Sequence, residues 1–115
     1  MGMTEVPVRV VNLADASRLA EVDLVVDSGA IYSVVPGGVL RRIGVEPHEV
    51  QTFDLAYGES VRSSVGDVRY EVADRSGAAP VIFGRRGDAS LLGVVTRLRL
   101  DPLRRLLRPL RLMIA

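Results

Sequence analysis

The chain of 115 residues contains no cysteine and a single histidine, His48. Without cysteine it has no disulfide framework, no thiolate metal site and no cysteine nucleophile. One histidine without cysteine makes a poor ligand set for zinc, so we predict no metal and no other cofactor. A Ser–His–Asp triad would have to use His48, but this residue follows Pro47 in a turn-like stretch, and we expect it in an exposed loop.

Tryptophan and lysine are also absent, and aromatic residues make up only 4% of the chain. The core of the expected single domain, residues 1–115, must therefore consist mainly of Val, Leu, Ile and Ala. The net charge of +1 predicts no nucleic-acid partner, and the arginines crowded into residues 97–111 indicate a solvated face rather than a phosphate-binding patch. With no apolar run long enough for a membrane span and no signal-peptide pattern, a cytoplasmic location is expected.

One acidic residue stands at the end of an apolar run. The stretch Leu24–Ala30 (LVVDSGA) carries Asp27 directly into a turn of small residues. A buried carboxylate is costly unless hydrogen-bonded, and the Ser28 hydroxyl with nearby backbone amides could satisfy it. Gly29 and Ala30 leave room for another segment to come close. Such a turn presents a carboxylate to a ligand, although Asp-Ser-Gly is also common in plain turns.

The first half of the chain reads as strands with one short helix. Alternating β-branched residues predict strands over Val6–Val11 and Glu21–Val26, and residues 31–35 continue in extended form. A short helix is predicted over Gly37–Ile43, because its apolar residues share one face and Gly44 follows as a C-terminal stop.

A long hairpin follows. Thr52–Tyr57 runs up, Gly58–Ser60 turns, and Val61–Val72 runs back with Gly66 as a bend or bulge. A glycine at the tip and few apolar residues there predict a mobile hairpin, which is either a cover over a ligand or an ordinary surface feature. Tyr57 either lines a cleft or covers the base of the hairpin.

The next segments alternate turns with short apolar runs. Asp74–Gly77 is predicted as a turn, Pro80–Gly84 as a buried strand and Arg85–Asp88 as a charged loop. The run Ser90–Gly93 (SLLG) is the second notable signal, and Val94–Leu98 is expected to form one or two helical turns.

The C-terminal residues permit two interpretations. Leucines spaced by three and four positions from Leu103 fit an amphipathic helix, but Pro109 would break it after barely two turns. Two short strands, over residues 103–107 and 110–115, are therefore preferred. The apolar tail of the second is expected to be buried.

The stretches Val25–Ala30 (VVDSGA) and Leu91–Gly93 (LLG), with their spacing, resemble the retropepsin-like aspartic proteases, the single-lobed family of the retroviral proteases, and look most similar to its small bacterial members. There a strand ends in Asp-Thr/Ser-Gly-Ala, and a later strand of two hydrophobic residues and Gly lies beside it. The resemblance runs from Val6 to the end. It implies an all-β barrel with one or two short helices that forms a homodimer. Val94–Thr96 departs from the pattern, because the family places an acid or amide soon after the glycine.

The resemblance also implies an aspartic endopeptidase acting on peptides or proteins. One Asp-Ser-Gly element serves one lobe, so two copies of the chain would supply the carboxylate pair that activates a water molecule. The implied roles are catalysis for Asp27, support of its loop for Ser28, Gly29 and Ala30, the substrate flap for Tyr57 and Gly58, and the strand behind the loop for Leu91, Leu92 and Gly93.

Two other functions stay open. The chain could be a peptide-binding or assembly module that keeps this fold without efficient proteolysis, which the residues after Gly93 and the short chain favour. Nucleic-acid binding through the arginine-rich end is the third functional hypothesis. Fold alone cannot separate them, because function belongs to the site.

Overall fold

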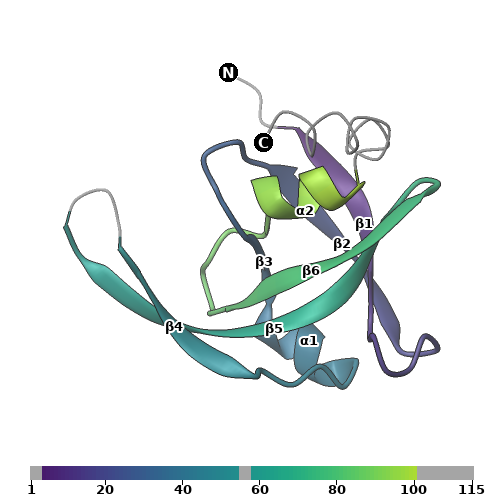
Figure 1. Cartoon of the computed structure of the whole chain (residues 1–115), viewed down its shortest axis with the longest axis horizontal. Coiled ribbons are helices and arrows are strands. Elements are labelled where there is room, and N and C mark those ends of the chain that lie inside the picture. Colours follow the sequence, from purple (N-terminus) through teal and green to yellow (C-terminus); the bar gives the residue numbers. More distant parts are fainter. Residues whose placement is uncertain (1–3, 55–57, 101–115) are drawn as a thin grey trace, which may run out of the picture.

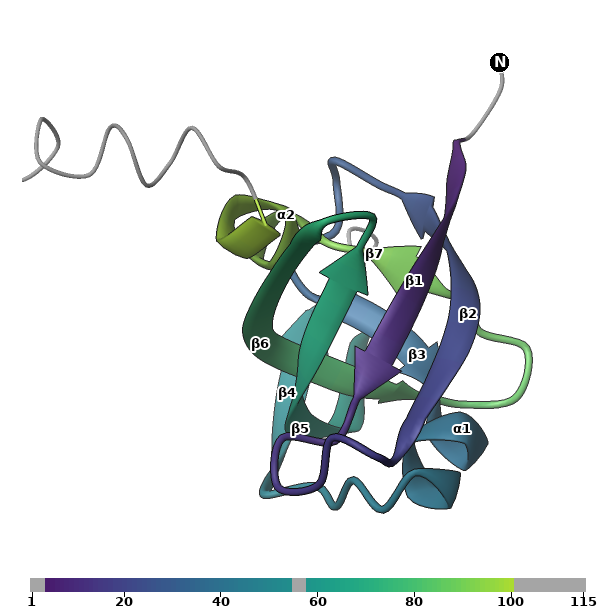
Figure 2. The same cartoon turned by 90° about the vertical axis from the view of Figure 1, so that its right-hand side faces the viewer.

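The computed structural model describes residues 4–54 and 58–100 (Figure 1). Within these ranges, seven strands form one sheet in the order β1-β2-β7-β3-β6-β5-β4, and β1 also pairs with β5. The second pairing rolls the sheet into a barrel, with α2 near one end and α1 near the other (Figures 1 and 2). The elements are β1 (Glu5–Val11), β2 (Leu19–Val26), β3 (Ser33–Pro36), α1 (Gly37–Arg42), β4 (Glu49–Asp54), β5 (Ser60–Val72), β6 (Arg75–Gly84), β7 (Leu91–Leu92) and α2 (Val94–Leu100).

The core is made by alternate residues of the strands, because successive side chains of a strand point to opposite faces. In β5 and β6 the buried residues include Val68, Tyr70 and Val81. The core is mostly Val, Leu and Ile, as the composition predicts, but Tyr70 is fully buried at its centre. Its hydroxyl donates a hydrogen bond to the carbonyl oxygen of Pro80 at 2.9 Å, and burial raises the pKa of Tyr70.

Most predicted elements of the first half are confirmed. The strands expected at Val6–Val11 and Glu21–Val26 are β1 and β2, which pair antiparallel. The helix expected from Gly37 is α1. Gly44 follows it with a φ of +81°, the left-handed conformation that glycine adopts without steric cost, so the predicted C-terminal stop is confirmed.

One prediction of the second half is wrong, and of the two alternatives given for Gly66, a bend or a bulge, the bulge is excluded. The turn expected at Asp74–Gly77 lies at Ala73 and Asp74, and β6 begins at Arg75, because this part of the strand is held by pairing with β5 rather than by apolar alternation. Gly66 is no bulge, since β5 pairs with β6 in unbroken register through it. A Cβ at Gly66 would lie 3.1 Å from a ring carbon of Phe83, so the glycine serves close packing.

The hairpin expected in the middle of the chain is present as β4 and β5, which pair from Glu49 opposite Val65 to Asp54 opposite Ser60. Tyr57 and the strands expected at 103–107 and 110–115 lie outside the described residues. Within the described ranges, no helix is both long and apolar enough to cross a membrane.

Candidate active site

Asp27 follows β2 directly, and the short strand β7 lies beside the end of β2. The two strands run parallel, with Val25 opposite Leu91 and Val26 opposite Leu92. The amide of Asp27 continues this pairing by donating to the carbonyl oxygen of Leu92 at 3.3 Å. On its other side β7 pairs with β3, so it is inserted between the strand that enters the Asp27 turn and the strand that leaves it.

The Asp27 turn holds its carboxylate by local hydrogen bonds. The amide of Gly29 donates to Asp27 Oδ1 at 2.8 Å, and the amide of Ala30 donates to the Asp27 carbonyl oxygen at 3.2 Å. A Cβ at Gly29 would lie 3.3 Å from the same Oδ1, so a larger residue would crowd this contact. Asp27 is half-buried, and Ser28 and Gly29 are exposed. The second carboxylate oxygen, Oδ2, has no hydrogen-bond partner among the residues described. The turn thus fixes one carboxylate oxygen of Asp27 through a backbone amide.

The start of α2 packs against the far side of this turn. The amides of Val94 and Val95 donate to the carbonyl oxygens of Ala30 and Ile31 at 2.9 and 3.0 Å. These are amides of the first helical turn, which have no partner within a helix. The helix therefore satisfies its own free donors by fixing the backbone of the Asp27 loop.

At Gly93, the residue between β7 and α2, the chain comes very close to the backbone of Ile31 and Tyr32. A Cβ there would lie 2.6 Å from the carbonyl oxygen of Tyr32 and 2.8 Å from that of Ile31, closer than real Cβ contacts allow. The requirement for glycine at this position thus follows from the packing, and Leu91 and Leu92 pair with the end of β2 immediately before Asp27.

Ser33 and Thr96 form a buried polar contact that the sequence analysis missed. Both side chains are fully buried, their hydroxyl oxygens lie 2.6 Å apart, and Ser33 Oγ accepts a hydrogen bond from the amide of Gly93 at 2.9 Å. This contact ties β3 to α2 immediately after the Asp27 loop. The available signal was a hydroxyl inside an otherwise apolar strand, since buried hydroxyls are nearly always paired.

The β4–β5 hairpin reaches the Asp27 loop through an aromatic contact. Phe53 of β4 and Tyr32 pack edge to face, with ring centroids 5.9 Å apart and planes at 73°. This edge-to-face arrangement is favourable for aromatic pairs. Gly58 has a φ of +92° in the turn of the hairpin, with open space where a Cβ would stand. Phe53 was assigned only to a strand by the sequence, so its contact with the loop is new.

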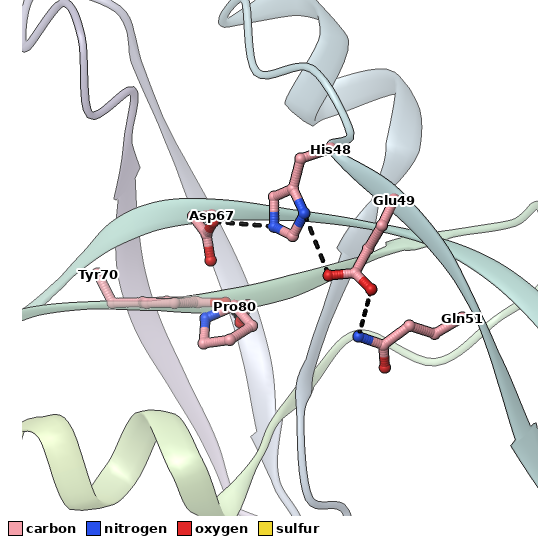
Figure 3. Close-up of polar contacts among 6 residues, drawn as sticks. All are labelled: His48, Glu49, Gln51, Asp67, Tyr70 and Pro80. Carbon is pink, nitrogen blue, oxygen red and sulfur yellow. Dashed lines mark hydrogen bonds and ion pairs between the residues drawn. The ribbon is translucent and has the colours of Figure 1, made fainter.

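His48 lies outside this site. Its ring is 46% exposed and stands between two carboxylates, with Nδ1 3.2 Å from Glu49 and Nε2 2.9 Å from Asp67 (Figure 3). Gln51 donates to the other oxygen of Glu49. Both ring nitrogens of His48 therefore contact carboxylates, and neither contacts a serine. No group of three or more His, Asp or Glu able to hold a metal ion occurs in the described part of the chain.

No protein-family model and no curated protein sequence matches the chain. Among solved structures it is similar to the protease of simian foamy virus (mac), with a TM-score of 0.56 and 18% identity over 81% of this chain and 90% of that one. That likeness agrees with the mainly β architecture and the single sheet of the described residues. The chain therefore has the single-lobed, retropepsin-like barrel fold.

Proposed function

We propose that the chain is an aspartic endopeptidase that acts as a homodimer. The observation that carries the proposal is the Asp27 turn. Its carboxylate is half-buried, Oδ1 accepts from the Gly29 amide, and Oδ2 has no hydrogen-bond partner in the described ranges 4–54 and 58–100. The turn is braced from behind by β7 and α2, which is what a reacting group needs to keep its geometry.

The chemistry requires two copies of Asp27, because one chain supplies one such turn. Two carboxylates brought together at a two-fold axis cannot both ionise easily, so they share a proton and titrate as a pair. The ionised one takes a proton from a water molecule between them, while the protonated one donates its proton to the peptide carbonyl oxygen as the water attacks the carbon. The product of this attack is a gem-diol intermediate. The carboxyl that took the proton from water then donates it to the amide nitrogen, and the other carboxylate takes a proton from a diol hydroxyl. The C–N bond breaks to give an acid and an amine, and the pair again shares one proton.

The surroundings of Asp27 are suited to such a pairing. Ser28 and Gly29 are exposed beside the carboxylate, so a second copy of the loop can approach, and the Ser28 hydroxyl is available to bond across the axis. Ala30 is small, and its carbonyl oxygen is already held by Val94. We assign Leu91, Leu92 and Gly93 the role of a rigid support for the loop.

The β4–β5 hairpin is the proposed cover over bound peptide. Phe53 lies one position before the last strand pair of the hairpin, so its contact with Tyr32 holds the turn end of the hairpin beside the Asp27 loop. We place Gly58 and Tyr57 in the part that closes on the substrate. An extended peptide between loop and hairpin would add main-chain hydrogen bonds to the strands, as peptides do when they augment a sheet.

The test compares the wild type with Asp27→Asn and with Asp23→Asn, a matched control that removes an exposed carboxylate from β2, the strand that precedes Asp27. Each chain is incubated with a mixed peptide library between pH 4 and 7, and cleavage is read by mass spectrometry. We expect the wild type and Asp23→Asn to cleave and Asp27→Asn to be inactive while remaining folded and dimeric. Fragments ending at Asp101 are ignored, because the Asp101–Pro102 bond hydrolyses unaided in acid.

Undiminished cleavage by a folded Asp27→Asn chain would overturn the assignment of Asp27. If no chain cleaves although all are folded and dimeric, the same fold serves as a peptide-binding or assembly module. Sedimentation velocity on the same samples tests the homodimer separately.

A further inference from the structure

A second concave site lies between α1, the β4–β5 hairpin and the loop after β6, and it shares no lining residue with the Asp27 turn. Its cavity has a volume of about 680 Å³. Four arginines from three parts of the chain line it: Arg41 from α1, Arg62 from β5, and Arg85 and Arg86 from the loop after β6. No acidic residue is among the lining residues, and we call this site the arginine pocket.

Two of these arginines are held in place by neighbouring groups. The guanidinium carbon of Arg41 lies 5.3 Å from the centroid of the Phe83 ring, a cation–π contact. A Cβ at Gly37 would stand 2.8 Å from Arg41 Nη1, so the glycine leaves the space in which this side chain lies. The Arg85 guanidinium donates a hydrogen bond to the carbonyl oxygen of Arg62 and thereby ties the loop to the hairpin.

The positive charge of the arginine pocket is not balanced by ion pairs. Among the described residues, the ion pairs involve Arg9 and His48 and none of the four pocket arginines.

Four acidic side chains of β4, β5 and the loop after β6 contact groups other than the guanidinium groups of the pocket. Glu49 and Asp67 contact His48 (Figure 3), Asp54 accepts from the Ser60 hydroxyl, and Asp88 accepts from the backbone amide of Arg85. Several like charges gathered around one concavity favour an anionic ligand.

The strand beside the pocket has a free edge. Among the described residues, β4 is the last strand of the sheet and pairs with β5 alone (Figure 1). An edge strand presents unpaired amides and carbonyl oxygens to which an extended peptide can bond. Val50 of β4 lines the pocket and is 54% exposed, which offers an apolar contact beside the arginines.

We propose that the arginine pocket and the edge of β4 together bind an extended, acidic polypeptide segment. Carboxylates of the segment pair with the guanidinium groups of Arg62, Arg85 and Arg86, and its backbone adds to β4. Arginine suits this role because its planar fork of donors matches the two oxygens of a carboxylate. A polypeptide is favoured over a nucleic acid because the net charge of the chain is only +1, the arginines surround one cavity, and a strand edge bonds to peptide backbone. The proposal does not depend on catalysis by Asp27.

The experiment titrates the full chain into a fluorescent peptide of about ten residues, a length that matches a strand, with alternating Glu and Thr. Anisotropy reports binding, with a matched Gln-Thr peptide and a single-stranded RNA of similar length as comparisons. Arg62→Gln is compared with Arg69→Gln, which removes the same charge from an exposed position of the same strand. Measurements are repeated in the Asp27→Asn chain, so that hydrolysis of the peptide cannot alter the signal.

We expect the acidic peptide to bind and the Gln-Thr peptide not to bind. Arg62→Gln should weaken binding about tenfold, the usual loss for one charge-assisted pair, while Arg69→Gln leaves it unchanged. The combined Arg85→Gln and Arg86→Gln variant should weaken it further. Equal effects of Arg62→Gln and Arg69→Gln would mean that charge attracts the peptide without a site, and absence of binding would refute the proposal. If the RNA binds more tightly than the acidic peptide and depends on the same arginines, the ligand of the arginine pocket is a nucleic acid and the proposal of a polypeptide ligand is refuted.

Discussion

Ser33 is a buried hydroxyl on which two other polar groups depend, and its removal gives a sharp test of how the Asp27 loop is braced. Ser33 Oγ accepts from the Gly93 amide at 2.9 Å and lies 2.6 Å from Thr96 Oγ1, with no exposed surface on either side chain. Ser33→Ala therefore leaves a buried amide and a buried hydroxyl without their partner. An unsatisfied buried group costs about 1–3 kcal/mol, so the free energy of unfolding should fall by about 2–4 kcal/mol.

The measurement is urea denaturation of the wild type, Ser33→Ala and a matched control, Ser63→Ala. Ser63 is half-buried in β5, and a substitution there should change the free energy of unfolding by less than about 0.5 kcal/mol. A further variant adds Thr96→Val to Ser33→Ala. Because it removes the orphaned hydroxyl, it should recover part of the lost stability.

The amide of Gly93 provides a local readout. Its hydrogen exchange should quicken in Ser33→Ala relative to amides of β5, because its acceptor is gone. If Ser33→Ala is as stable as Ser63→Ala and the exchange of Gly93 is unchanged, the buried contact does not brace the loop and the reasoning is refuted.

Two other predictions concern Gly93 and the Asp15 carboxylate. Gly93→Ala should destabilise the fold by about 1–3 kcal/mol, because its Cβ would stand 2.6 Å from the Tyr32 carbonyl oxygen. The control Gly38→Ala should leave the stability unchanged, because the space around Gly38 is open. Equal melting temperatures of the two variants would contradict this prediction. Hydrogen bonds from the Ser17 hydroxyl and amide lower the pKa of Asp15 below its ordinary value of 3.8. The ionised carboxylate therefore stabilises the turn above pH 3.8, and this stabilisation is lost as the pH falls through the lowered pKa of the folded state. Ser17→Ala should raise the pKa of Asp15 toward 3.8 in an NMR titration, and an unchanged pKa would contradict the assignment.

Local patterns predicted the parts of this protein that depend on near neighbours. Strand alternation found β1 and β2, and the glycine after α1 marked the end of that helix. The same reasoning failed at Arg75, where β6 begins with polar and small residues. This part of β6 is a strand because it pairs with β5, and an alternation pattern does not report the partner of a strand.

The sequence by itself determined that Asp27 stands at the end of an apolar strand in a turn of small residues, because strand and turn preferences act over a few adjacent positions. Only the tertiary structure decided what lies around that turn. Ser33 and Thr96 are 63 positions apart, and Phe53 of the β4–β5 hairpin contacts Tyr32 in the loop between β2 and β3. The arginines of the pocket likewise come from three separate parts of the chain. Such contacts arise when strand pairing and core burial bring distant segments together, and no short stretch of sequence records which distant group it will meet.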